Sequence, residues 1–219
     1  MTLYKSFLAA FLAVSVQAAP LTAATESHKD IMEAAAAACE DMVDAVASNG
    51  MSAAQTKITD LRAALKKAHG FLKADVVLQL DSRADEIAAL AKSDSKTRLS
   101  LAAIETFKDI VNAADWQKVK VPKDVSMLDY TGFKLGILAA DANTDWAEAA
   151  KTADEAHRVW EKLIPAFKDE DLVDLAHTLD DGTLDAVKRQ DALGLKFATK
   201  LQLVSIDLIE TSFTSKSRP

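Results

Sequence analysis

The sequence predicts an all-α protein, folded as an antiparallel up-and-down bundle of about seven to eight helices. The 219 residues include 41 Ala but only six Gly and four Pro, whereas average usage would give roughly 26 Gly and Pro together. Apolar residues recur at alternating spacings of three and four along nearly the whole chain, which is the period of one helix face. No stretch shows the sustained two-residue alternation of a half-buried strand. Because the links between the apolar runs are short, successive helices are expected to be antiparallel neighbours.

The apolar repeats divide into eight runs, and each run predicts the buried face of one helix. In chain order the runs are Ile31 to Ala45, Ala54 to Ala68, Val77 to Ala91, Ile104 to Ala114, Leu128 to Leu138, Trp146 to Phe167, Leu172 to Leu179 and Phe197 to Leu208. The sixth run is the most regular, and it makes Trp160 a large core residue. In the last run, Phe197, Leu201, Val204 and Leu208 are predicted to face the core.

Residues that cap or stop helices lie between these runs. We place breaks at Asn49-Gly50, His69-Gly70, Ser93-Asp94-Ser95 and Asp181-Gly182-Thr183. A Pro-containing link at 117–123 divides the mature chain into halves at 19–116 and 124–219, each with about four runs. When the first half is shifted by 95 residues, several of its apolar positions coincide with apolar positions of the second half. The expected break at Gly182 has no counterpart at position 87, however. Two tandem four-helix units and one extended bundle both remain open.

Residues 1–18 resemble a secretory signal peptide. Lys5 supplies the positive charge, residues 7–16 form an apolar stretch, and Val16-Gln17-Ala18 is a small-x-small cleavage site. We therefore expect a mature chain that begins at Ala19 and is exported, to a periplasm or to the exterior. The alternative, an uncleaved membrane anchor, would need about 20 apolar residues, about twice this stretch. No later segment predicts a membrane span in the mature chain.

Composition excludes several classes of protein and disfavours others. A hydrophobic content of 49% and a mean hydropathy of +0.01 exclude a disordered chain. One Cys excludes a disulfide scaffold and a paired-cysteine haem attachment. The net charge of −7 argues against nucleic acid and against an anionic membrane surface, both of which attract clustered Lys and Arg. The chain has no Gly-x-Ser-x-Gly elbow, phosphate loop or His-Glu-x-x-His motif, so we do not expect an enzyme.

A repeated Asp-x-x-His motif is the sharpest candidate for a metal site. Asp154 and His157 form the first copy, and Asp174 and His177 the second. Residues three apart share a helix face, and di-iron bundles use a related Glu-x-x-His motif. The helical register, however, places these residues on the flank or the outside of their helices, where His157 would pair with Glu161. A metal-binding or haem-binding bundle for storage or electron transfer is therefore the alternative reading.

Gly132 and Gly136 stand one turn apart inside a predicted helix that also carries Tyr130 and Phe133. Each mid-helix glycine costs roughly 1 kcal/mol relative to Ala, so the pair requires a compensation. Close packing against another helix is one reading, and a ligand groove beside the two aromatic rings is the other. The leading functional hypothesis is a non-enzymatic exported bundle that binds a protein partner or a small ligand and has no cofactor. Cys39 is expected to act as a small core hydrophobe.

Overall fold

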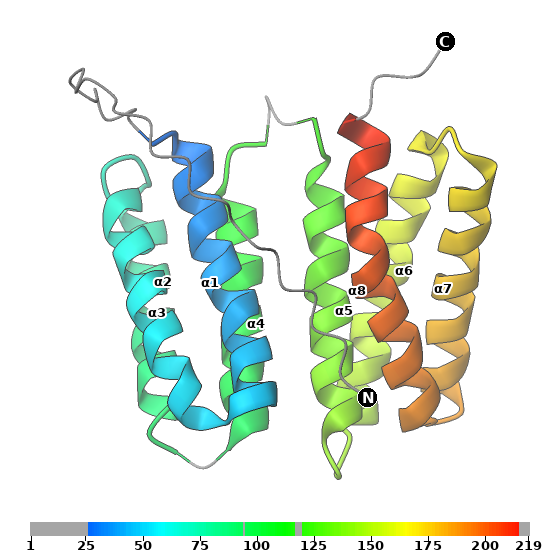
Figure 1. The fold of residues 1–219 in the computed structure, drawn as a ribbon, viewed down its shortest axis with the longest axis horizontal. Coiled ribbons are helices and arrows are strands. Elements are labelled where there is room, and N and C mark those ends of the chain that lie inside the picture. Colours follow the sequence, from blue (N-terminus) through cyan, green and yellow to red (C-terminus); the bar gives the residue numbers. More distant parts are fainter. Residues whose placement is uncertain (1–25, 94, 117–119, 215–219) are drawn as a thin grey trace, which may run out of the picture.

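The computed structural model describes residues 26–93, 95–116 and 120–214, and this part of the chain is helical apart from short connections (Figure 1). The α-helices are α1 His28–Asn49, α2 Ala54–Ala68, α3 Ala74–Leu90, α4 Lys96–Ala113, α5 Lys123–Ala140, α6 Trp146–Leu163, α7 Glu170–Lys188 and α8 Ala192–Thr214. Two 3-10 turns, η1 Met51–Ala53 and η2 Ile164–Ala166, follow α1 and α6. The described ranges contain no strand, which confirms the predicted all-α class. No described helix is long and apolar enough to cross a membrane.

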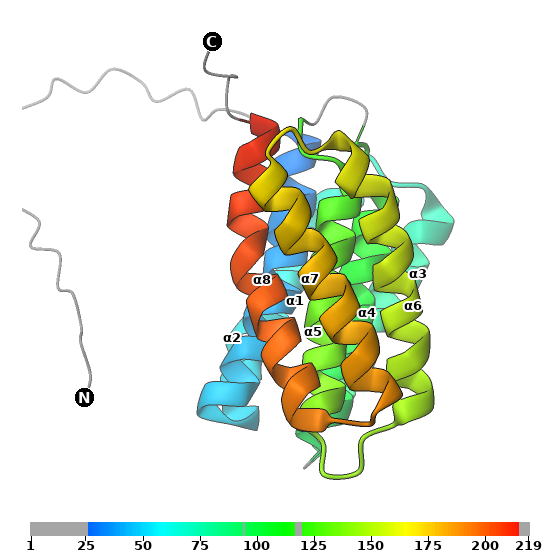
Figure 2. The same ribbon diagram turned by 90° about the vertical axis from the view of Figure 1, so that its right-hand side faces the viewer.

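The helices pack as two circuits of four. In the first circuit α1 and α3 each pack against α2 and α4, and in the second α5 and α7 each pack against α6 and α8. Helix α4 packs against α5 and so joins the circuits, which lie side by side in Figure 1 and one behind the other in Figure 2. Adding 95 to the first residues of α1 to α4 gives 123, 149, 169 and 191, whereas α5 to α8 begin at 123, 146, 170 and 192. The helix boundaries thus repeat along the chain at nearly constant spacing.

Polar residues cap several helices as their sequences suggest. The Ser27 hydroxyl accepts a hydrogen bond from the Asp30 amide, and the Asp30 carboxylate accepts one from the Ser27 amide, which completes a capping box at α1. Ser95, Asp145 and Asp169 cap α4, α6 and α7. These contacts satisfy amides that the first helical turn leaves without partners.

One large core cluster spans both circuits. It includes Leu61 and Ile104 of the first circuit together with Leu128, Tyr130 and Trp160 of the second. Cys39 is fully buried in this cluster, as its apolar surroundings predicted. A smaller cluster around Leu135 and Leu195 fills the far end of the second circuit.

The predicted break at Asp181-Gly182-Thr183 is wrong, because all three residues lie inside α7. Thr183, Ala186 and Val187 continue the buried face of the helix beyond Gly182. One glycine inside a helix costs about 1 kcal/mol, which is less than the stabilisation gained by burying the apolar side chains of that extra turn. The chain instead turns at Gln190, whose φ of 54° is in the left-handed region.

The predicted buried face of α8 is also wrong. Phe197, Leu201, Val204 and Leu208 are 64%, 40%, 71% and 56% exposed. Helix α8 instead buries the face that carries Leu195, Ala198, Thr199, Gln202, Ile206 and Ile209. Gln202 and Leu203 lie against Gly132 of α5, and Thr199 lies against Gly136, so the missing side chains of the two glycines let the helices approach closely. The larger apolar residues remain outside because α8 has two apolar faces and only one can pack against α5.

Candidate functional site

A cavity of about 630 Å³ lies where the first circuit meets the second. Helices α1 and α5 begin at this end of the molecule and α4 and α8 end there, at the top of Figure 1. The lining residues come from the first half of α1, the segments around 71–72 and 113–116, the last turns of α4, the start of α5 and Glu210 of α8. This volume is within the usual range for small-molecule sites.

Aromatic and aliphatic side chains form much of the cavity wall. Phe71, Phe107 and Trp116 line it together with Met32 and Ile110. The Trp116 indole Nε1 donates a hydrogen bond of 2.8 Å to the Val111 carbonyl, which fixes the ring at the end of α4. The Phe71 ring stacks on the His28 ring at a centroid distance of 3.9 Å. Two of the aromatic rings in the wall, Phe71 and Trp116, are thus held by contacts with neighbouring groups.

Two partly buried carboxyl groups, Glu40 of α1 and Asp129 of α5, line this cavity together with its apolar side chains. Burial raises the pKa of Glu40 to about 7, and the charges of Asp41, Asp44 and Glu210 add to the effect. Burial also raises the pKa of Asp129 to about 8, with further contributions from Glu40, Glu210 and Asp207. Within the described residues neither carboxyl has a hydrogen-bonding or ion-pairing partner. The cavity thus holds two acids that no neighbouring group of the described chain neutralises.

Neither Glu40 nor Asp129 is among the candidate site residues that the sequence predicts. Glu40 follows Met32 and Ala36 at intervals of four, and all three side chains line the cavity. An acid at such a spacing from apolar residues is a signal that could have been noticed. A single helix nonetheless cannot distinguish a flank exposed to water from one that faces another helix, because that depends on how α1, α4 and α5 pack.

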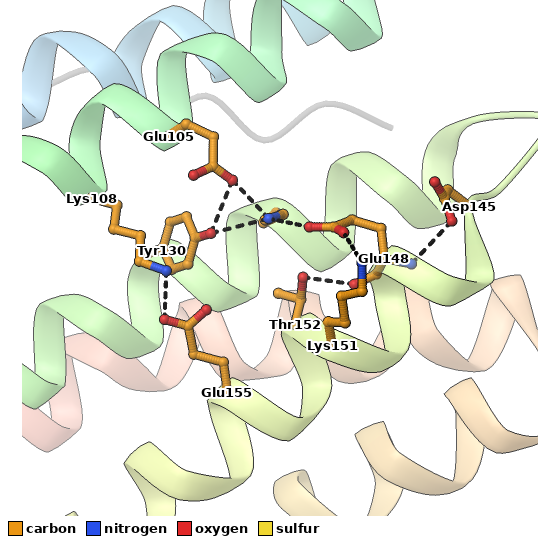
Figure 3. A network of polar contacts seen from close by, with 9 residues as sticks. Glu105, Lys108, Tyr130, Asp145, Glu148, Lys151, Thr152 and Glu155 are labelled. Atoms are coloured by element: carbon orange, nitrogen blue, oxygen red, sulfur yellow. Dashed lines mark hydrogen bonds and ion pairs between the residues drawn. The ribbon is translucent and has the colours of Figure 1, made fainter.

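The structure places Tyr130 in a polar network between α4, α5 and α6 (Figure 3). Tyr130 does not line the cavity. The Tyr130 hydroxyl donates to Glu105 at 3.0 Å, and the ammonium of Lys134 lies 2.7 Å from Glu105 and 2.7 Å from Glu148. Lys108 pairs with Glu155 at 2.6 Å and lies 4.4 Å from the centroid of the Tyr130 ring. Burial opposes the charge of Lys134, but its hydrogen bonds to Glu105, Glu148 and Tyr130 raise its pKa. The network therefore joins both circuits with charges that are already paired.

The remaining residues of the expected groove are packed against neighbouring helices. A Cβ on Gly132 would lie 2.9 Å from Leu203 Cδ2, and one on Gly136 would lie 3.5 Å from Thr199 Oγ1. Phe133 packs against the main core cluster. None of the four residues lines the cavity. The arrangement agrees with close helix packing, the other reading of the glycine pair.

The residues of the alternative metal reading do not converge on one point. His157 Nδ1 donates to Asp180 Oδ2 at 2.7 Å, and His157 Nε2 lies 3.7 Å from Glu161. Asp154, Asp174 and His177 are exposed. In the part of the chain that the structure describes, no group of three or more His, Cys, Asp or Glu side chains is arranged to hold a metal ion. Asp180, 6% exposed, is the partner of His157 that the sequence did not reveal.

No protein-family model, curated protein or solved structure matches this chain. The candidate functional site is the cavity, which combines aromatic side chains with two carboxyl groups that have no partner among the described residues.

Proposed function

We propose that this protein is a non-enzymatic binding protein whose cavity takes a small organic cation, a molecule with an apolar body and an ammonium group. The observation that carries the proposal is the position of Glu40 and Asp129 on the cavity wall, where neither carboxyl has an ion-pairing partner among the described residues. A bound ammonium would neutralise these carboxyls, and the cavity walls would exclude water from the apolar body. Aromatic faces such as that of Trp116 also attract cations.

The charge of the ligand follows from the electrostatics of the cavity. Glu33, Asp115 and Glu210 also line the cavity, and the lining residue Lys29 pairs with Glu33 at 2.6 Å. An anionic ligand would meet the repulsion that already raises the pKa of Glu40 and Asp129. A cation would lower both values and drive proton release on binding.

We also propose that the protein works after export, in keeping with the signal peptide expected at residues 1–18. These residues lie outside the described ranges. A soluble exported chain that binds a small ligand fits the two features together.

The proposal is tested with two ligands that share one apolar body, 4-phenylbutylammonium and 4-phenylbutyrate, using titration calorimetry on the purified protein. The ammonium is expected to bind and the carboxylate is not. Because Glu40 and Asp129 must be ionised to attract the cation, its affinity should rise about tenfold or more between about pH 6 and about pH 9. Equal affinity for the two ligands would overturn the proposal.

Asp129→Asn supplies the matched test of the site. This change keeps the side-chain volume but removes the charge, and we expect it to weaken ammonium binding about tenfold at pH 9. Asp174→Asn makes the same chemical change at an exposed position of α7 and should leave binding unaltered. If both variants bind as the unchanged protein does, the cavity is not the site.

A further inference from the structure

Helix α8 carries an apolar stripe that runs along its outer face. The stripe consists of Leu193, Phe197, Leu201, Val204 and Leu208, which are between 40% and 80% exposed. At 100° per residue these five positions fall within an arc of about 80°, so they form one continuous strip. A contiguous apolar strip rimmed by polar residues is typical of an interaction surface.

The first circuit shows what covers the corresponding helix. Helix α4 begins 96 residues before α8 and occupies the equivalent place in its own circuit, yet it packs on α5 of the second circuit as well as on α1 and α3. Among the described helices, α8 packs extensively only on α5 and α7. The outer face of α8 therefore lacks the cover that α4 receives.

Charged residues border only one side of the stripe. Lys196, Lys200 and Asp207 each stand one position before a stripe residue, so all three lie on the same flank, and all are exposed. The other flank, at Gly194, Ala198, Gln202, Ser205 and Ile209, carries no charge. Neither lysine has an ion-pairing partner within the described ranges, and Asp207 stands beside Glu210 in the acidic half of the helix. The flank is thus basic toward the start of α8 and acidic toward its end.

We propose that α8 is a self-association surface on which a second copy of this chain docks through its own α8 in the antiparallel direction. When two identical helices cross antiparallel at Leu201, residue i faces residue 402 minus i. Leu193 then faces the neighbourhood of Leu208, Phe197 that of Val204, and Lys196 that of Asp207. An antiparallel two-fold arrangement brings like flanks together, so both Lys196–Asp207 pairs form. A parallel pair would set this charged flank against the uncharged one.

Sedimentation velocity from about 1 μM to about 1 mM protein tests the association itself, since small interfaces dissociate in this range. The expected result is a concentration-dependent equilibrium between monomer and dimer. A monomer at every concentration overturns the proposal, and so do oligomers that grow beyond the dimer, because an antiparallel two-fold pair is closed.

Charge reversal tests the register. Lys196→Glu and Asp207→Lys should each raise the dimer dissociation constant about tenfold or more by placing like charges together. An equimolar mixture of the two variants should recover association, because every pair in the mixed dimer is again of opposite charge. Lys168→Glu, at an exposed position before α7, makes the same change in net charge as Lys196→Glu and should have no effect. If Asp207→Lys instead strengthens association by reducing the net negative charge, the register is wrong.

Cysteine substitution tests the direction. Leu201→Cys lies at the crossing point and should form a disulfide with its own copy under mild oxidation, whereas Leu193→Cys should not, since its copy lies at the other end of the helix pair. Cross-linking at both positions would indicate a parallel pair and overturn the proposal. The natural Cys39 is fully buried and does not compete. All these variants alter exposed side chains, so circular dichroism melts serve as the check that folding is retained.

Discussion

Trp160 is among the largest fully buried side chains, with 1% exposure. Trp160→Ala should lower the free energy of unfolding by about 3–5 kcal/mol, because it removes the largest side-chain volume from the core. His177→Ala, at an exposed position of α7, should change it by less than about 0.5 kcal/mol. Denaturant melts measure both.

Trp160→Phe serves as the intermediate variant in that series. The indole Nε1 is buried and has no hydrogen-bond partner among the described residues. Because replacement by Phe removes this unsatisfied donor along with part of the ring, the loss should be less than half that of Trp160→Ala. Equal losses for the two variants would mean that ring volume has no part in the stabilisation.

His157 illustrates how a tertiary partner changes the expectation from register alone. A histidine on a helix flank is expected to tolerate replacement, but His157 pairs with Asp180, whose side chain is nearly buried. His157→Ala should therefore destabilise the protein by about 1–2 kcal/mol, because it leaves that carboxyl without its partner.

This loss should depend on pH in a defined direction. The hydrogen bond to Asp180 raises the pKa of His157 above 6.5. A raised histidine pKa contributes stability that is complete below the unfolded value and disappears as pH rises through the folded value. The difference between unchanged and His157→Ala protein should thus be larger at about pH 6 than at about pH 9. A difference that grows with pH would contradict the pair.

At the scale of the elements, two helical glycines differ in their surroundings. Gly182 has open space where a Cβ would lie. A Cβ on Gly132 would instead lie 2.9 Å from Leu203 Cδ2 and 3.2 Å from Gln202 Nε2. The Gln202 amide donates to the Leu128 carbonyl at 2.7 Å, so it cannot easily move. Gly182→Ala should stabilise by about 0.5–1 kcal/mol through helix propensity. Gly132→Ala should be less stable than Gly182→Ala by about 1–2 kcal/mol, as thermal melts would show.

Lys134 joins three helices, and its removal tests the link between the circuits. Lys134→Met should cost about 2–3 kcal/mol, less than a fully buried ion pair would, because Glu105 and Glu148 are about one-third exposed. Lys151→Met is the matched control. Lys151 also contacts Glu148, at 3.4 Å, but its side chain is 76% exposed. Its replacement should cost less than about 0.5 kcal/mol in the same denaturant melts.

At the scale of the whole molecule, the expected signal peptide makes a direct prediction. Cleavage after Ala18 gives an exported protein whose intact mass corresponds to a chain starting at Ala19. Mass spectrometry of the protein recovered from the exported fraction measures this. Retention of residues 1–18 would favour the anchor instead.

The chain itself determines most of the architecture. The spacing of apolar residues located every helix, because each amphipathic run has one face that must leave water. Seven of the eight predicted faces are largely buried, and breaks at Gly50 and Gly70 lie at helix ends. The repeat of about 95 residues was also visible, although the supposed break at Gly182 obscured it.

The tertiary structure determines which neighbour each helix face contacts, which the helical period of the sequence does not specify. Helix α8 has apolar residues on two faces, and the choice between them depended on the glycines of α5, far away in the chain. In the sequence, Glu40 and Asp129 look like ordinary acids on the flank of a helix, and only the packing of the helices places them on the wall of a cavity. Likewise, His157 pairs with Asp180 because α6 packs against α7. Periodicity reports how one helix divides apolar from polar residues. Which neighbour meets each flank is set by packing across the whole chain, and the candidate site depends on those contacts.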